Sequence, residues 1–184
     1  LQLLDTDGPF LSIPTLRRVW PQGIPTLGEA PKAALAQAKP LFEKAWDAHG
    51  RGELAADDYA RVRDAWLATV LGEVIGWGAY LDWAAEPVVA ASPSHRVQVA
   101  SSAALVRDGV RAALVLVVGP VESLRDIADD GWAASPIDRM EQLLTTAGCP
   151  IGVVTDGRWW ALVSKPEQVM VASGITDALT WTEE

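Results

Sequence analysis

Three carboxylates in the middle of the chain, Glu86, Asp108 and Glu122, are the candidates for metal-dependent chemistry. Carboxylates that converge on one point can hold Mg²⁺, which activates water for attack on a phosphate. Asp108 directly precedes Gly109, however, and an Asp-Gly pair is typical of a tight turn in which the carboxylate bonds to the local backbone. We therefore favour a turn at Asp108, keep these acids as the catalytic candidates, and predict no metal site.

Basic and aromatic residues supply the candidates for contact with DNA or with another domain. We expect Arg107, Arg111 and Arg158 to gather near one edge of a sheet. Trp159 and Trp160 are adjacent, so on a strand their indoles must point to opposite faces. The outward indole would then be available to cover an interface.

The histidines and the cysteine indicate no further chemistry. His49 and His95 are the only histidines, and they lie in separate segments where a loop position is the ordinary explanation. The serines near His95 lack the glycine-flanked setting of a hydrolase nucleophile. Cys149 is the only cysteine, which excludes an internal disulfide and a cysteine-based metal site and favours a reducing cytoplasm.

The bulk composition narrows the classes of protein further. A chain of 184 residues that is 49% hydrophobic can bury one sizeable core. A net charge of -9 repels phosphate backbones, so we expect that this chain alone does not bind nucleic acid. No apolar run approaches the roughly 20 residues that span a bilayer, and no signal peptide is evident. We expect a cytoplasmic protein and, because the first residue is Leu1, a fragment of a larger chain.

The spacing of apolar residues predicts an N-terminal helical hairpin. Residues 1–28 hold four prolines and three glycines and are expected to form an irregular lead-in. Apolar residues at steps of three and four predict helices over 31–49 and 56–76, which should pair as a hairpin. The sequence thus divides into a lead-in and hairpin over 1–86, packing on a core over 87–184.

The second half changes to the pattern of an α/β core. Extended segments are expected at 97–99, 103–106 and 112–118, with a tight turn between the last two. Ser135, Pro136 and Asp138 are typical of a helix start, and Gly148 marks the end of that helix. Segments 151–155 and 159–164 flank an Asp-Gly pair, which predicts a hairpin with a two-residue turn.

Two segments carry a resemblance to a known family: Gly131–Met140, with the sequence GWAASPIDRM, and Gly152–Trp160, with the sequence GVVTDGRWW. Together with the opening GPFL and WPQG motifs, they resemble the N-terminal nuclease-like region of large bacterial restriction-modification or phage-defence DNA methyltransferases of type IIG-like kind. That resemblance implies a restriction-endonuclease-like core, α-β-β-β-α-β-β, preceded by the helical hairpin. It also implies an S-adenosylmethionine-dependent methyltransferase domain, and no glycine-rich methyl-donor loop occurs in this chain.

The resemblance also sets an expectation for catalysis. Nucleases of this fold hold Mg²⁺ between carboxylates on adjacent strands with a lysine two residues beyond the second, and Asp108 stands where the first acid belongs. The strand that should carry the second carboxylate and the lysine, AALVLVV over 112–118, has no acid and no lysine. We therefore expect a non-catalytic domain that contacts the other domains of the parent protein directly and DNA only indirectly. The alternatives are a Mg²⁺ endonuclease with a displaced site and a docking domain that uses an apolar face of the Trp-bearing helices.

Overall fold

The computed structural model describes residues 4–166 and 170–181, and the chain divides into two compact units. Unit 1 combines the residues up to Pro21 with Asp82–Ala178, and unit 2 combines Gln22–Leu81 with the residues from Leu179. The sequence grouped the lead-in with the helices, whereas the structure groups it with the sheet. The reason is that strand β1 (Asp5–Asp7) pairs with strand β9 (Ala172–Asp177) near the other end of the chain.

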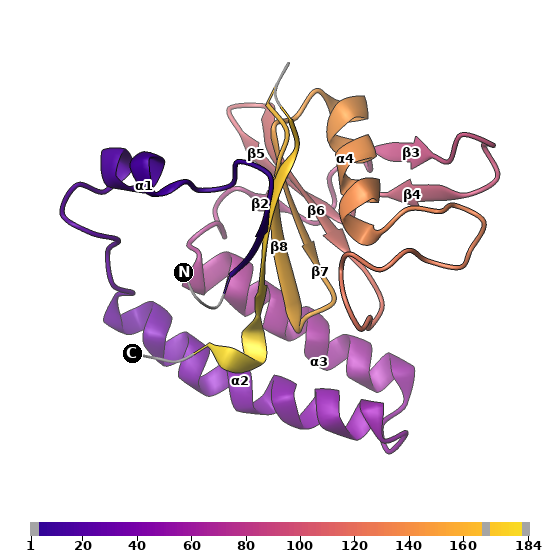
Figure 1. The fold of residues 1–184 in the computed structure, drawn as a ribbon. Coiled ribbons are helices and arrows are strands. Elements are labelled where there is room, and N and C mark those ends of the chain that lie inside the picture. Colours follow the sequence, from indigo (N-terminus) through magenta and orange to yellow (C-terminus); the bar gives the residue numbers. More distant parts are fainter. Residues whose placement is uncertain (1–3, 167–169, 182–184) are drawn as a thin grey trace. The chain divides into compact units, whose positions relative to one another are not determined.

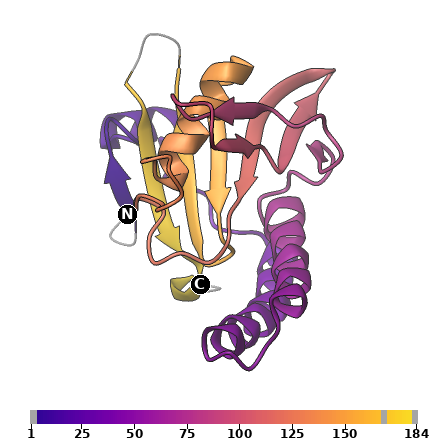
Figure 2. The same cartoon turned by 90° about the vertical axis from the view of Figure 1, so that its right-hand side faces the viewer.

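Within the described residues, a seven-stranded sheet has the order β1-β9-β8-β7-β6-β5-β2, which can be followed in Figures 1 and 2. Besides β1 and β9, its strands are β2 (Leu81–Asp82), β5 (Ala103–Arg107), β6 (Val110–Val117), β7 (Ile151–Thr155) and β8 (Trp159–Ser164). A separate pair is formed by β3 (Val89–Ala91) and β4 (Gln98–Ala100). The chain is therefore an α/β protein, as the sequence predicts.

Helix α4 (Pro136–Ala147) connects β6 to β7, the parallel pair of the sheet. Its start is a capping box in which Ser135 and Asp138 bond reciprocally to each other's backbone N–H, and Gly148 ends it in the left-handed conformation. The predicted helix and both of its ends are confirmed. Because β6 and β7 run in parallel, their carboxyl ends meet at one edge of the sheet.

Alternation along the strands gives each face of the sheet its own set of side chains. Leu114 and Leu116 of β6 and Val154 of β7 belong to a buried cluster that also holds Met140 and Leu143 of α4, and the helix lies against this face in Figure 2. Gly152 leaves the space that Met140 fills, because a Cβ there would collide with its side chain. On β9, Gly174 in the same way makes room for the ring of Phe10, which anchors the lead-in.

Unit 2 contains the predicted helical hairpin. Helix α2 (Glu29–Gly50) and helix α3 (Ala56–Thr69) pack together, and a π-helical turn (Val70–Val74) follows α3. The rings of Phe42 and Trp66 stack at 5.3 Å with an interplanar angle of 11°, and both side chains are buried. The second helix is thus shorter than the expected 56–76, because its last turn widens before Gly76 adopts a positive φ of 79°.

The structure confirms most of the other strands predicted from the sequence and contradicts one predicted turn. The strands near 97–99, 103–106 and 112–118 are confirmed, as is the hairpin of β7 and β8. Its predicted two-residue turn is wrong, because the last residues paired across it are Thr155 and Trp160. The lead-in also contains a short helix, α1 (Ile13–Val19), and a 3-10 turn (Ala178–Thr180) follows β9. None of the helices in the described part of the chain has the length and apolar character to cross a membrane.

Candidate functional site

The edge of the sheet where β6 and β7 end collects several predicted site residues, and we call it the carboxyl edge: residues 119–122, 156–158 and Asp177. Its centre is Asp156, which is fully buried. One carboxylate oxygen, Oδ1, accepts hydrogen bonds from the backbone N–H of Arg158 at 2.9 Å and of Trp159 at 2.7 Å. The other, Oδ2, accepts from the backbone N–H of Val121 at 3.1 Å. Asp156 therefore ties the segment after β6 to the turn after β7.

These bonds make Asp156 a structural acceptor and not a reactive acid. Burial raises the pKa of its carboxyl group, and the backbone hydrogen bonds from Trp159, Val121 and Arg158 partly offset that rise. Both oxygens already point at backbone donors of the surrounding turns. The carboxylate explains why the turn is longer than the Asp-Gly pair suggested, since the side chain itself organises residues 156–159.

Arg158 lies partly buried at the carboxyl edge, next to Trp159 of β8. Nε and Nη2 of Arg158 donate to Oδ2 of Asp177 at 3.1 and 2.8 Å, and the guanidinium lies 4.6 Å from the centre of the Trp159 ring. The hydrogen bond to Asp177 raises the pKa of Arg158, and the charge of nearby Glu122 acts in the same direction. The positive charge of the guanidinium is therefore already balanced by carboxylates of its own chain.

The two adjacent tryptophans do point to opposite faces. Trp159 packs, partly buried, against the α4 side of the sheet, and Trp160 is 5% exposed on the other side. The indole N–H of Trp160 donates to the carbonyl of Gly157 at 2.9 Å, whereas the buried N–H of Trp159 has no partner within the described residues. Neither ring stands free in solvent in the way that a base-stacking platform requires.

The other candidates lie at the opposite edge, beside the start of β6. Asp108 and Gly109 have φ values of 52° and 75°, as in a tight hairpin turn, and the Asp108 side chain is 90% exposed. Its carboxylate lies 3.7 Å from Nε of Arg107. Nη2 of Arg111 donates to the backbone carbonyl of Glu86 at 3.1 Å, so these two residues are neighbours.

The predicted site residues therefore form two separate groups. Strand β6, with 8 residues, is about 23 Å long at roughly 3.3 Å per residue, and it lies between Asp108 and Glu122. The arginines that the sequence expected at one edge are likewise divided, with Arg158 at the far end from Arg107 and Arg111. The residues present do not fit a Mg²⁺ site: no group of three acidic, histidine or cysteine side chains in the described part of the chain could hold a metal ion.

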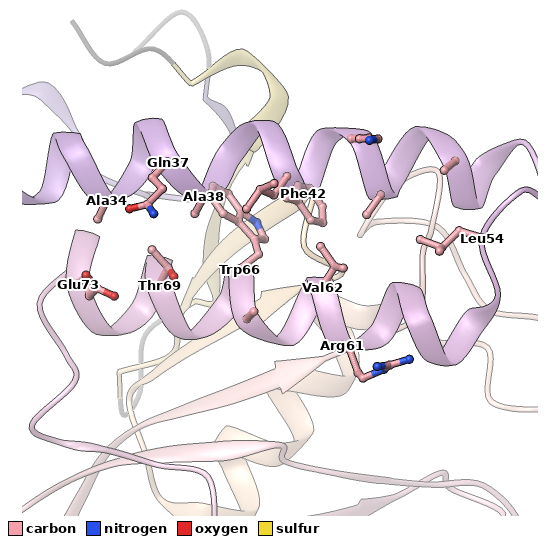
Figure 3. Close-up of a pocket in the computed structure, with 15 residues that line it drawn as sticks. Ala34, Gln37, Ala38, Phe42, Leu54, Arg61, Val62, Trp66, Thr69 and Glu73 are labelled. Atoms are coloured by element: carbon pink, nitrogen blue, oxygen red, sulfur yellow. The ribbon is translucent and has the colours of Figure 1, made fainter.

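Unit 2 carries the clearest binding feature, an apolar groove of about 680 Å³ between α2 and α3. We call it the α2–α3 groove; Figure 3 shows it with Phe42 and Trp66 in its middle. Its walls are mostly small or apolar: Ala34, Ala38, Ala45 and Ala48 of α2, and Val62 and Ala65 of α3. Leu41 also lines the groove, and it is 64% exposed. A leucine that is left so exposed adds little burial free energy to the folding of its own chain.

The groove has charged groups only toward its ends. Glu73 lies beside Ala34 at one end, and Arg61 lies toward Leu54 at the other, as Figure 3 shows. Lys44 also lines the groove, two helical turns beyond Gln37 and thus toward the Arg61 end. An apolar channel of this kind, with opposite charges at its ends, suits the apolar face of an α-helix better than a phosphate backbone.

The sequence contains the signal for this groove: the alternative of a docking domain named an apolar face of these helices, but not the residues that form it. Ala34, Ala38, Leu41, Ala45 and Ala48 follow each other at steps of four, three, four and three, the spacing of a coiled-coil seam. The buried stripe of α2 instead contains Leu35, Phe42 and Ala45. Two overlapping apolar stripes on one helix indicate two packing faces, of which the hairpin itself occupies one.

No known protein family, curated protein or solved structure matches the chain.

Proposed function

We propose that this chain is a non-catalytic protein-docking domain whose α2–α3 groove receives an amphipathic helix. The observation that carries the proposal is the groove itself: an apolar channel of about 680 Å³ lined by alanines, with an exposed Leu41 on its wall. In helix-in-groove recognition the bound helix presents apolar anchors at steps of three and four residues to an apolar groove, and the wall of the α2–α3 groove supplies the apolar surface that such anchors need. Exposed apolar surface of this kind marks an interaction site.

We further propose that the parent protein is a cytoplasmic restriction-modification or phage-defence DNA methyltransferase of type IIG-like kind. The support is the sequence resemblance of Gly131–Met140 and Gly152–Trp160 to the nuclease-like region of such proteins. In the structure these segments supply the capping box of α4 and the turn organised by Asp156. S-adenosylmethionine would then be bound by another domain, and DNA would be contacted by that domain and only indirectly by this chain.

A restriction-endonuclease-like core is the finer part of the fold proposal. A crossover helix, α4, between β6 and the parallel strand β7 agrees with such a core. The central strand β6 reads VRAALVLV, with neither an acid nor a lysine. The core in this proposal is thus a scaffold that has kept the fold of a nuclease without its metal-binding residues.

The docking proposal is tested by photo-crosslinking from inside the groove. Leu41 is replaced by a benzoyl-phenylalanine residue in the protein as expressed in cells and, as a matched control, so is Val110, which is 66% exposed but lies on β6 in unit 1. After irradiation in cells, mass spectrometry identifies the crosslinked peptide. We expect position 41, and not position 110, to capture a segment whose apolar residues repeat at helical spacing. Absence of a peptide crosslink at 41, or equal crosslinking at both positions, would refute the proposal.

A further inference from the structure

We propose that the occupant of the α2–α3 groove is the same groove of a second copy of this chain, so that two hairpins form a twofold-symmetric four-helix bundle. This inference rests on the proposed docking function and names its partner. It is carried by three properties of the groove: the symmetry of its charges, the symmetry of its apolar residues, and its size.

The charges at the two ends are complementary under twofold rotation. Arg61 of α3 and Glu73 of the π-helical turn that follows are six residues before and six after Leu67, and they lie at opposite ends of the groove. A twofold axis that crosses the groove at the level of Trp66 places the α3 helices of the two copies antiparallel. Arg61 of each copy then faces Glu73 of the other, and like charges are kept apart.

The apolar wall of α2 has the same symmetry. Ala34 and Ala48 are each seven residues from Leu41, and the seam continues through Ala38 and Ala45 between them. With the twofold axis at Leu41, the Leu41 side chains of the two copies meet each other at the axis, and Ala34 of each copy lies opposite Ala48 of the other. The small alanines on both sides of Leu41 let the two helices approach closely, so the surface is complementary to itself, as an interface between identical surfaces requires.

The face is large enough for a specific dimer. Helix α2 has 22 residues and is about 33 Å long, helix α3 has 14 residues and is about 21 Å long, and two packed helices present a face about 20 Å wide. With a mean length of about 27 Å, such a face buries about 1,100 Å² over both partners, above the roughly 1,000 Å² that a specific interface needs. The contact would cover Leu41, which is otherwise left 64% exposed.

The experiment measures the oligomeric state by sedimentation equilibrium and uses reversed charges. Arg61→Glu and Glu73→Arg each place like charges opposite one another twice in the dimer, so each variant alone should dimerise at least tenfold more weakly than the unmodified protein. An equimolar mixture of the two variants restores both pairs, and we expect it to form the heterodimer. Arg51→Glu is the matched control, because Arg51 is ion-paired with Glu53 of its own chain, as Arg61 is with Asp58, but does not line the groove.

Leu41→Glu provides a second test that does not depend on ion pairs. The side chain is mostly exposed, so circular dichroism should show an unchanged fold while the dimer dissociates. A monomeric unmodified protein, or variants and mixtures that all dimerise alike, would overturn the second copy as the occupant. A monomer whose residue 41 still crosslinks to a helix of a different protein would overturn this inference and leave the proposed docking function intact.

Discussion

Replacement of Asp156 tests whether one buried carboxylate holds the carboxyl edge together. Asp156→Ala removes the acceptor for the backbone N–H groups of Val121, Arg158 and Trp159. Asp156→Asn keeps one oxygen, which can still accept from Arg158 and Trp159. Its amide nitrogen then faces the N–H of Val121, so that two donors oppose each other.

The expected losses follow from the number of donors left without an acceptor. Each buried N–H without a partner costs about 1–3 kcal/mol, so Asp156→Ala should lower the free energy of unfolding by about 4 kcal/mol and Asp156→Asn by about 1–2 kcal/mol. Urea denaturation followed by tryptophan fluorescence measures both, because Trp159 and Trp160 lie beside the replaced residue. Asp129→Ala, at an exposed position, is the control and should change stability little.

The pH dependence has a definite sign. Burial raises the pKa of Asp156 above its ordinary 3.8, so the folded state binds this proton more tightly than the unfolded state does. The carboxyl group therefore contributes most stability below pH 3.8 and loses part of it as the pH rises through the folded-state pKa. Since asparagine does not titrate, the stability advantage of the unmodified protein over Asp156→Asn should shrink with rising pH in that window and stay constant above it.

Two results would refute this reasoning. If Asp156→Ala were no more destabilising than Asp129→Ala, the three hydrogen bonds would not hold the edge together. If the advantage over Asp156→Asn grew with pH, the backbone donors would outweigh burial, and the pKa would lie below the ordinary value instead of above it.

Two further predictions concern the nuclease question and helix α4. The purified chain should leave plasmid DNA intact in Mg²⁺ or Mn²⁺; cleavage that disappears in Asp108→Ala would establish the displaced nuclease site instead. Ser135→Ala removes the side chain that accepts from the backbone N–H of Asp138, and we expect it to destabilise the protein by about 1 kcal/mol in thermal unfolding. Ser135→Thr, which retains the hydroxyl group, should lose much less; equal losses in both variants would show that the cap is not the cause.

Local signals in the sequence sufficed for some elements and failed for others. Helix α4 was predictable because Ser135, Asp138 and Gly148 each act on backbone only a few residues away. Strands β1 and β9 were not, because their pairing joins the two ends of the chain and depends on Phe10 packing over Gly174. The connection through Asp156 was hidden for the same reason: its Oδ2 bonds to Val121, 35 residues away.

Three arginines of unit 1 are ion-paired within the fold, which argues against direct contact between them and a DNA phosphate backbone. Arg158 donates a hydrogen bond to Asp177, and Arg139 donates to both carboxylate oxygens of Asp130 at 2.7 Å. The positive charges of both arginines are therefore paired with carboxylates within the fold. Arg125 likewise lies 3.1 Å from a carboxylate oxygen of Asp5. Binding to phosphate would have to break such pairs in a chain of net charge -9. The α2–α3 groove depends less on such an exchange, because most of the surface that its occupant would remove from water is apolar.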